Sequence, residues 1–352
     1  MVILKRTLTR KIRIGNIYVG GDSKISVQSM TNTDTRNIEA TVNQILKLEE
    51  VGCDIVRCAV PDLEAAKALE HIKKSINIPL VADIHFDYRL ALESINGGVD
   101  ALRINPGNIG GEDRIKLVAE VANEKGIPIR IGVNSGSLEK DILKKYGKVT
   151  SKGLVESALR HVELLEKNNF NNIIISIKSS DVMQTIESYR LLSQKVDYPL
   201  HIGVTEAGTT WRGTIKSSVG IGTLLSEGIG DTIRVSLTGD VLEEVRVGKE
   251  ILKSLGIIEY GIKFVSCPTC GRTQIDLVKI AKEVEEKLAY CDKNIKVAIM
   301  GCAVNGPGEA KEADIGIAGG KGDGLIFKKG KIIKKVRENE LVSELIKEIE
   351  KM

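Results

Sequence analysis

The sequence predicts an α/β fold, a (β/α)8 TIM barrel followed by a small α+β domain. Two patterns indicate the barrel, since eight short apolar runs recur along the first 256 residues and amphipathic helical stretches lie between them. Strands and helices that alternate at roughly thirty-residue spacing form a parallel sheet, and eight such units over roughly 250 residues fit a closed barrel. A change of pattern after Leu255 indicates the second domain.

A hairpin over residues 11–22 precedes the eight expected strands. The strands begin at Ile25, Asp54, Pro79, Ala101, Pro128, Asn172, Pro199 and Asp231. Several helical stretches end at a glycine that suits a left-handed C-cap, among them Gly52, Gly126 and Gly256. An open doubly wound sheet is the alternative, but the glycine-rich dinucleotide fingerprint after the first strand is missing.

The expected domains are residues 1–256, the barrel, and residues 257–352. The second domain begins with a strand, a turn and a long helix over residues 263–289. A second strand and a glycine-rich loop follow, and a short strand pair and a final helix complete the chain.

Composition excludes some classes of partner. The formal net charge is only +4 and aromatic residues make up 3% of the chain, which argues against a nucleic-acid-binding protein. No run is long and apolar enough for a membrane helix, and the basic N-terminus lacks the apolar core of a signal peptide. A cytoplasmic enzyme without a membrane or nucleic-acid partner is expected.

The six cysteines fall into two groups, and a disulfide framework is not expected in the cytosol. Cys53 and Cys58 lie in an apolar strand context and are interpreted as buried thiols. Cys267 and Cys270 share a turn at the end of one expected strand, and Cys302 lies at the end of another. Soft thiolate ligands of this kind select an iron–sulfur cluster, zinc or copper(I).

The fourth ligand decides between these metals. All four histidines lie in the first domain, and Cys291, in a polar turn after a long helix, is interpreted as incidental. Three thiolates without a soft fourth ligand suit structural zinc poorly, because zinc usually closes its tetrahedron with Cys or His. They suit a cluster with one unusual iron. Glu309 is the candidate oxygen ligand, and an ordinary surface carboxylate is its alternative interpretation.

Basic residues recur in the barrel strands, whose C-terminal ends form the active site of such folds. Five cations come from five different strands, namely Arg57, Arg103, Arg130, Lys178 and Arg234. Unpaired, each would cost several kcal/mol to bury, so a polyanionic ligand is expected to neutralise them. Two phosphoryl groups match this number of cations better than one, and the arginine fork suits phosphate.

Other polar side chains share the strand ends. Asp83 and His85 stand two residues apart on one strand and so share a face, as do Arg103 with Asn105 and Arg234 with Ser236. Asn134 ends the fifth strand and Glu206 the seventh. The carboxylates and His85 are expected to handle protons in reductive or eliminative chemistry on a small phosphorylated molecule.

Long motifs resemble the 4-hydroxy-3-methylbut-2-enyl diphosphate synthase family (2-C-methyl-D-erythritol 2,4-cyclodiphosphate reductases) in its compact two-domain bacterial form. They are SCPTCGRTQIDL, MGCAVNGPGEA, VQSMTNTDT, RCAVPD, VADIHF, LRINPGN, IRIGVNSGSL, HIGVTEAG and TIRVSLTGDV, and they cover essentially the whole chain. Val241 stands where the family pattern has proline, which is the one departure.

The resemblance implies reductive ring opening and dehydration of 2-C-methyl-D-erythritol 2,4-cyclodiphosphate in isoprenoid biosynthesis. It implies a [4Fe–4S] cluster on Cys267, Cys270, Cys302 and Glu309, where substrate oxygen can replace the glutamate. The strand-end cations with Asn105, Asn134 and Ser236 would hold the diphosphate. Reduced flavodoxin or ferredoxin would supply electrons, and a head-to-tail homodimer would bring the cluster domain of one subunit to the barrel of the other.

Two questions stay open at this level. Glu206 is the hypothetical proton donor to the departing hydroxyl, and Asp83 is its rival. An iron–sulfur sensor that binds a phosphorylated ligand without turnover, and a zinc-stapled barrel enzyme such as a carbon–carbon lyase, are the alternative functions. A radical S-adenosylmethionine enzyme lacks support, because its close three-cysteine motif is missing.

Overall fold

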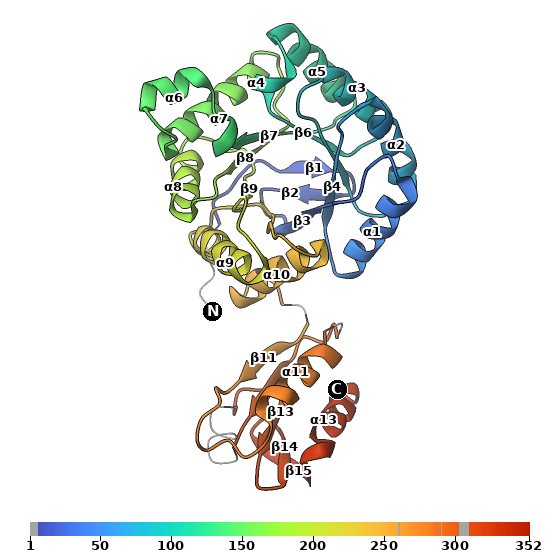
Figure 1. Ribbon diagram of the computed structural model, residues 1–352, viewed down its shortest axis with the longest axis vertical. Coiled ribbons are helices and arrows are strands. Elements are labelled where there is room, and N and C mark those ends of the chain that lie inside the picture. The colour runs from blue at the N-terminus through green and yellow to red at the C-terminus, as the bar shows by residue number, and fades with distance from the viewer. Residues whose placement is uncertain (1–5, 260, 290, 303–309) are drawn as a thin grey trace. The chain divides into compact units, whose positions relative to one another are not determined.

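The computed structural model describes residues 6–259, 261–289, 291–302 and 310–352 (Figure 1). The chain forms two compact units, Met1–Leu255 and Gly256–Met352. The division falls one residue before the boundary expected from the sequence.

The first unit contains a closed parallel barrel, as the sequence predicts. Its hydrogen-bonded order is β8-β7-β6-β5-β4-β3-β10-β9, and a parallel bridge between Ile175 and Leu200 joins the two ends. The strands are β3 (Ser26–Met30), β4 (Ile55–Ala59), β5 (Leu80–Asp83), β6 (Ala101–Ile104), β7 (Ile129–Asn134), β8 (Ile173–Lys178), β9 (His201–Ile202) and β10 (Thr232–Ile233). All eight expected strands are therefore confirmed.

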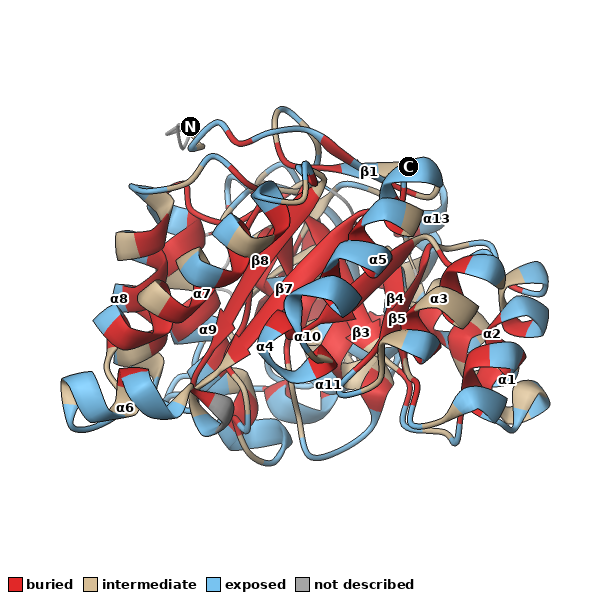
Figure 2. Ribbon diagram, turned by 90° about the horizontal axis from the view of Figure 1, so that it is seen from above, coloured by how far each residue is buried: buried red, intermediate tan, exposed pale blue. Residues whose placement is uncertain are grey.

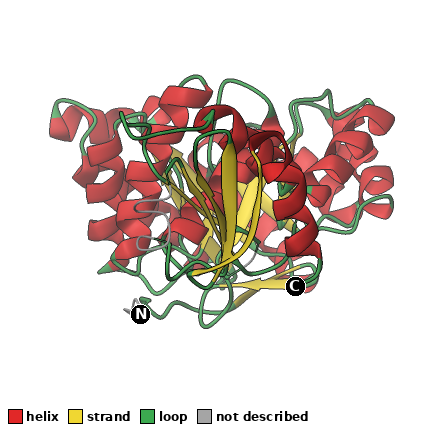
Figure 3. Cartoon of the chain, turned by 90° about the horizontal axis from the view of Figure 1, so that it is seen from below, coloured by secondary structure: helices red, strands yellow, loops and turns green. Residues whose placement is uncertain are grey.

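Helices surround the strands (Figures 1 and 3). They are α1 (Ile38–Glu50), α2 (Leu63–Lys74), α3 (Tyr88–Asn96), α4 (Pro106–Ile109), α5 (Glu112–Glu124), α6 (Lys140–Tyr146), α7 (Ser151–Glu166), α8 (Val182–Ser193), α9 (Thr210–Ser226) and α10 (Val241–Ser254), with a 3-10 turn at Ser135–Ser137. Side-chain oxygens of Asn37 and Asp62 cap the first two helices. Gly52, Gly126 and Gly256 all have positive φ, as the C-cap interpretation requires.

The departure at Val241 has a simple local meaning. Asp240 caps α10 by accepting a hydrogen bond from the Leu242 N–H at 3.0 Å, so Val241 occupies the first helical position. Proline is favoured there because its fixed φ suits a helix start and its missing N–H is not needed. Valine also fits, and its side chain is buried.

The hairpin of β1 (Ile12–Ile14) and β2 (Ile17–Val19) lies across the ring of strands (Figure 1). Its apolar side chains pack against inward-facing residues at the start of four barrel strands, namely Ile55, Val81, Ala101 and Ile174. This contact closes the N-terminal end of the barrel with an apolar floor, so any polar ligand must enter from the other end.

Strand register identifies the side chains that face the barrel interior. Partners in a parallel pair point the same way, and successive residues alternate. Starting from the floor residues, the pairing places Arg57, Asp83, Arg103, Arg130 and Lys178 on the inner face. The strands are buried almost throughout (Figure 2).

The second unit is a small α+β domain with a five-stranded sheet in the order β11-β12-β13-β14-β15. The elements are β11 (Lys263–Ser266), α11 (Leu277–Lys287), β12 (Lys296–Met300), β13 (Ile315–Gly319), β14 (Asp323–Lys328), β15 (Lys331–Arg337), a 3-10 turn (Glu338–Glu340) and α13 (Leu341–Glu350). The first three strands are parallel and the last two antiparallel. Strand β13 lies where the sequence analysis had only a glycine-rich loop, and that expectation was wrong.

The buried alternation of β13 explains this error. Ile315 and Ile317 pack in the core beneath α11 and α13, while a Cβ at Gly316 would lie 2.5 Å from the ring of Phe327. The glycine is there for close packing and not for a turn.

Across the described residues, no helix combines the length and apolar character needed to cross a membrane.

Candidate functional site

Five cations converge at the C-terminal end of the barrel. Arg57, Arg103, Arg130 and Lys178 lie on β4, β6, β7 and β8, and all four are buried. Arg234 directly follows β10, and its side chain is 16% exposed. The placement expected from the sequence is therefore what the structure has, since each cation stands on its own strand or at its end.

Asp83 balances two of these cations. Its carboxylate lies 3.1 Å from Arg103 Nη1 and 3.5 Å from Arg57 Nε, and His85 Nε2 approaches to 3.5 Å. Burial by itself raises the pKa of Asp83, but Arg57, His85 and Arg103 together hold that pKa well below its usual range. Asp83 is therefore ionised at neutral pH and suits charge balance better than proton donation.

Glu244 on α10 is another buried carboxylate beside these cations. It accepts hydrogen bonds from Ser29 Oγ and the Leu237 N–H, both at 3.0 Å, and lies 3.6 Å from Arg234 Nε. The sequence analysis missed this residue. Its position on the same helical face as Val241, Val245 and Gly248 was the available signal, because a charge on an apolar face needs a partner.

Arg130 and Lys178 have no carboxylate within ion-pair distance in the described parts of the chain. Five cations against two carboxylates leave an excess of three positive charges. Arg130 Nη2 is buried without a hydrogen-bond partner among the described residues. Burial, and then the neighbouring guanidinium groups, lower the pKa of Lys178 well below its usual value. Such an excess fits a site for a polyanion.

Two glycines make room for these long side chains. A Cβ at Gly132 would lie 2.3 Å from Arg103 Nε, so the Arg103 side chain passes directly over β7. A Cβ at Gly203 would lie 2.3 Å from the Arg234 carbonyl oxygen and 3.5 Å from Lys178 Nζ. Gly203 is required because its close neighbour is backbone, whereas a side chain at position 132 would force the Arg103 guanidinium to move.

The uncharged candidates divide into two kinds. Asn105 is buried, and its Oδ1 accepts a hydrogen bond from the Gly107 N–H at 3.1 Å, so this side chain caps α4. Asn134 ends β7 as expected and is partly exposed. Ser236 is also partly exposed, three residues beyond the last β10 pair.

The proton-handling candidates differ in placement. His85 is 51% exposed, and its Nε2 lies 3.4 Å from Arg103 Nη1, so it stands beside the cations as expected. Glu206 does not end its strand, because β9 stops at Ile202. It lies in the following loop, is exposed and has a φ of 49°. The two-residue length of β9 explains the difference.

Two candidate metal ligands lie at neighbouring strand ends in the second unit. Cys267 follows β11 and Cys302 lies just beyond β12, and these strands pair in parallel. The Gly301 N–H donates to Cys267 Sγ at 3.1 Å. Cys270 is exposed on the turn that follows, and hydrogen bonds with Arg272 lower its pKa. Neighbouring thiols and an N–H donor toward sulfur fit an iron–sulfur cluster.

The described residues alone do not complete a metal site. Within the described ranges, no three His, Cys, Asp or Glu side chains gather closely enough to hold a metal ion together. Glu309 lies outside the described residues. Cys291 packs against the hydrophobic core of the unit, and Cys53 and Cys58 are buried, as expected. Burial raises the pKa of Cys53 to about 12.

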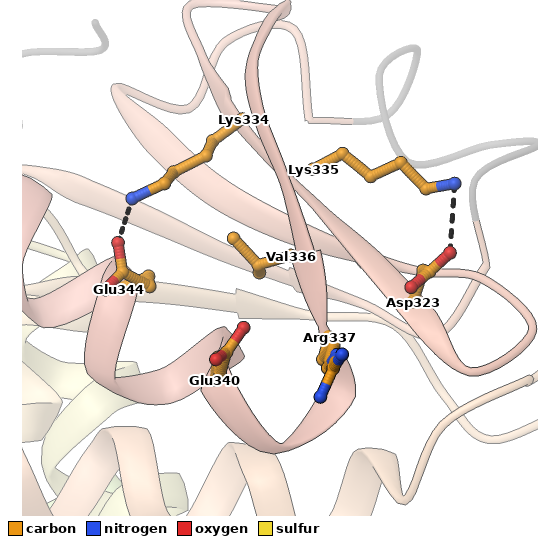
Figure 4. A pocket seen from close by; sticks show the side chains of 7 residues that line it. All are labelled: Asp323, Lys334, Lys335, Val336, Arg337, Glu340 and Glu344. Carbon is orange, nitrogen blue, oxygen red and sulfur yellow. Dashed lines mark hydrogen bonds and ion pairs between the residues drawn. The ribbon is translucent and has the colours of Figure 1, made fainter.

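A polar pocket of the second unit has a different charge balance (Figure 4). It is lined by Asp323, Lys334, Lys335, Val336, Arg337, Glu340 and Glu344. Lys334 pairs with Glu344, and Lys335 Nζ lies 2.9 Å from Asp323. Three cations face three carboxylates, so this pocket has no excess charge for an anion.

Comparison with known families agrees with the geometry. Residues 9–249 match the GcpE TIM-barrel domain, and residues 263–351 match the GcpE protein C-terminal domain. The chain belongs to the GcpE family.

Curated relatives match along their full length. A protein of Clostridium acetobutylicum is 69% identical over 349 residues, which is 99% of this chain and 100% of the relative. A protein of Geobacter sulfurreducens is 59% identical over 98% of each chain. Both are named 4-hydroxy-3-methylbut-2-en-1-yl diphosphate synthase (flavodoxin).

A solved structure shares the fold of part of the chain. Dihydropteroate synthase from Stenotrophomonas maltophilia aligns with a TM-score of 0.50 at 15% identity, covering 70% of this chain and 98% of that one. At this identity the likeness concerns the fold and not the chemistry.

Proposed function

We propose that this chain converts 2-C-methyl-D-erythritol 2,4-cyclodiphosphate into 4-hydroxy-3-methylbut-2-enyl diphosphate, an oxidoreductase step of isoprenoid biosynthesis. The relatives' names support this function for a chain that matches them over 98–99% of its length. The observation that carries the proposal is the excess of three buried positive charges at the barrel mouth. An anionic diphosphate neutralises it without any further group from the described chain.

The cations bind and orient the diphosphate. Arg57 and Arg103 are fixed by Asp83, and Arg234 lies near Glu244, so these three are pre-arranged before ligand arrives. Arg130 and Lys178 supply the unbalanced charge. Asn134 and Ser236 stand at the same end of the barrel as candidate hydrogen-bond partners, whereas Asn105 acts first as a helix cap.

Ring opening with loss of water requires two electrons and one proton for each substrate molecule. A [4Fe–4S] cluster held by Cys267, Cys270 and Cys302, with Glu309 as the fourth and replaceable ligand, would supply the electrons one at a time. We assign the proton to Glu206 or His85, the exposed candidates, because Asp83 is held ionised by its cations. Glu206 remains the preferred donor to the leaving hydroxyl.

Partner assignments rest on the family. The relatives' names support reduced flavodoxin as the electron donor, and ferredoxin is the alternative. We also propose a head-to-tail homodimer in the cytoplasm, in which each cluster domain serves the barrel of the other subunit.

The direct test is turnover by anaerobically purified protein. Brown, iron-containing protein should form product from the cyclodiphosphate with a chemical reductant. Ligand binding without product would favour the sensor alternative, and colourless zinc-loaded protein that resists cluster reconstitution would contradict the proposal.

Two variants test the residue roles. Glu309→Ala should still assemble a cluster, but the variant enzyme should turn over poorly. Full activity in this variant would mean that the cluster only transfers electrons and that Glu309 is not a replaceable ligand needed for the reaction. Glu206→Gln should bind substrate but slow single turnover, whereas unchanged chemistry with intact binding would remove Glu206 from the role.

A further inference from the structure

Polar side chains line the barrel interior along three neighbouring strands, below the cations. Register pairs Thr232 with His201 on one side and with Ser26 on the other, so these three inward-facing residues stand side by side on β9, β10 and β3. Gln28 is the next inward residue of β3. All four are buried, His201 completely.

Five polar atoms of this layer have no hydrogen-bond partner among the described residues. Neither ring nitrogen of His201 forms a hydrogen bond with any described residue, and the same holds for Ser26 Oγ, Thr232 Oγ1 and Gln28 Oε1. TIM-barrel interiors are mostly filled by Val, Ile and Leu, as the floor of this barrel is. Each buried unsatisfied group costs about 1–3 kcal/mol, so a whole layer of them indicates that small polar molecules bind there.

This polar layer adjoins the unbalanced cations. Gly203 is the inward position that follows His201 on β9, and Lys178 Nζ lies 3.5 Å from where its Cβ would be. The Lys178 ammonium therefore lies against the strand face from which the His201 imidazole projects. Arg130 Nη2, which is buried without a hydrogen-bond partner among the described residues, belongs to the same group of charges.

The imidazole of His201 is uncharged. Burial, and then the charges of Arg130 and Lys178, hold the pKa of His201 well below its usual value. A neutral imidazole has one nitrogen that accepts a hydrogen bond. It can thus solvate a cation without cancelling the charge, whereas a carboxylate in its place would neutralise the site intended for an anion.

We propose that His201 is a positioning residue for the anion-binding cations, and that water held by His201, Ser26, Gln28 and Thr232 accepts hydrogen bonds from Lys178 and Arg130. This inference rests on the proposed binding of a diphosphate by those cations. In the free protein the polar layer replaces bulk water, so the cations keep their charge and point toward the mouth.

Four arginines act on the charge of Lys178, namely Arg234, Arg57, Arg130 and Arg103. Asp83 lies beside Arg57, Arg103 and His85, and Glu244 on α10 lies beside Arg234. Lys178 is the member of this set that can lose its proton at moderately alkaline pH, because the arginines stay charged there. Anion affinity should therefore fall at alkaline pH as Lys178 is deprotonated.

The test is binding of inorganic pyrophosphate to the full-length, cluster-loaded protein, measured by calorimetry across a pH series. His201→Leu removes the acceptor, so affinity near neutral pH should drop about tenfold, the loss expected for one hydrogen bond to a charged group. Its alkaline fall in affinity should also move to lower pH, because the ammonium loses solvation. His201→Gln restores an uncharged acceptor and should return the alkaline fall to the wild-type pH.

Ile202→Val is the matched control, since this buried neighbour on β9 faces away from the interior, and it should behave as wild type. The inference would be overturned if pyrophosphate affinity varied with pH in His201→Leu as it does in the wild type. It would also be overturned if the alkaline fall in affinity moved as far in His201→Gln as in His201→Leu. If His201→Leu does not fold, the isosteric Thr232→Val should show a smaller displacement in the same direction, and an unmoved profile would count against it equally. Wild-type protein that does not bind pyrophosphate would overturn the proposed diphosphate site as well.

Discussion

The barrel mouth and strand β15 both carry many cations, but those of β15 are exposed whereas most of those at the mouth are buried. On β15, Lys331, Lys334, Lys335 and Arg337 are exposed, and two of the lysines pair with carboxylates at the pocket of Figure 4. At the mouth, Arg130 and Lys178 are buried, and the described residues offer them no carboxylate. The comparison teaches that local density of basic residues is a poor guide to an anion site. Loss of solvation is the better one.

The largest expected effect is on stability at Asp83. Asp83→Asn leaves Arg57 and Arg103 without a counter-charge and should lower the free energy of unfolding by about 3–5 kcal/mol. The folded-state pKa of Asp83 lies below its unfolded value, so this contribution is present above a pH of about 4 and is lost as pH falls further. Denaturant titrations at several pH values measure the loss of unfolding free energy and its dependence on pH. A variant as stable as wild type at neutral pH would contradict the buried ion pairs.

Replacing Arg130 should lower activity but raise stability, in contrast to the loss of stability expected at Asp83. Arg130→Met should reduce turnover by about 10²–10³-fold, since it removes a pre-arranged charge from the substrate site. It should also raise the free energy of unfolding, because a buried cation without a carboxylate is removed. Lys335→Met on β15 is the control and should leave turnover unchanged. Activity that falls equally in both variants would remove the contrast between the two regions.

Lys178 should give stability a distinctive pH dependence. Its folded-state pKa lies below its unfolded value, so the charged form opposes folding. The stability of the wild type relative to Lys178→Met should therefore rise with pH. The rise should begin near the folded-state pKa of Lys178 and end near its unfolded-state pKa of about 10.4. Thermal unfolding of both proteins across that range measures the difference. A constant difference would mean that Lys178 is not desolvated.

The smallest effect is expected on β15. Asp323→Asn removes the partner of Lys335, but both side chains are exposed and water replaces the lost contact. The free energy of unfolding should change by less than about 1 kcal/mol. The measurement is a denaturant titration of Asp323→Asn and Asp83→Asn under the same conditions. A loss as large as that at Asp83 would show that exposure does not separate the two regions.

The barrel and the cation set could be predicted because each depends on local pattern. Apolar runs of β-branched residues such as Ile173–Lys178 fix strands, and an arginine inside such a run must face the interior or the helices. Gly52 and Gly126 fix helix ends by their backbone alone.

Other features needed the tertiary structure. Glu244 and His201 become meaningful only when register and helix packing bring them beside the cations. Asn105 has the residue type of a ligand contact, but its backbone position makes it a helix cap. Strand β13 was missed because its glycines suggested a loop, although Gly316 is needed where two strands and Phe327 pack closely.

The contact between Gly132 and Arg103 also limits the order in which this sequence can change. A Cβ at position 132 would collide with the Arg103 guanidinium, so even alanine requires that group to move. The guanidinium pairs with Asp83 at 3.1 Å, and its movement would disturb this buried ion pair. The reverse exchange is not blocked by sterics, since shortening Arg103 only leaves space. A change at position 132 therefore costs less after position 103 has changed than before it, which gives the two exchanges a preferred order in descent.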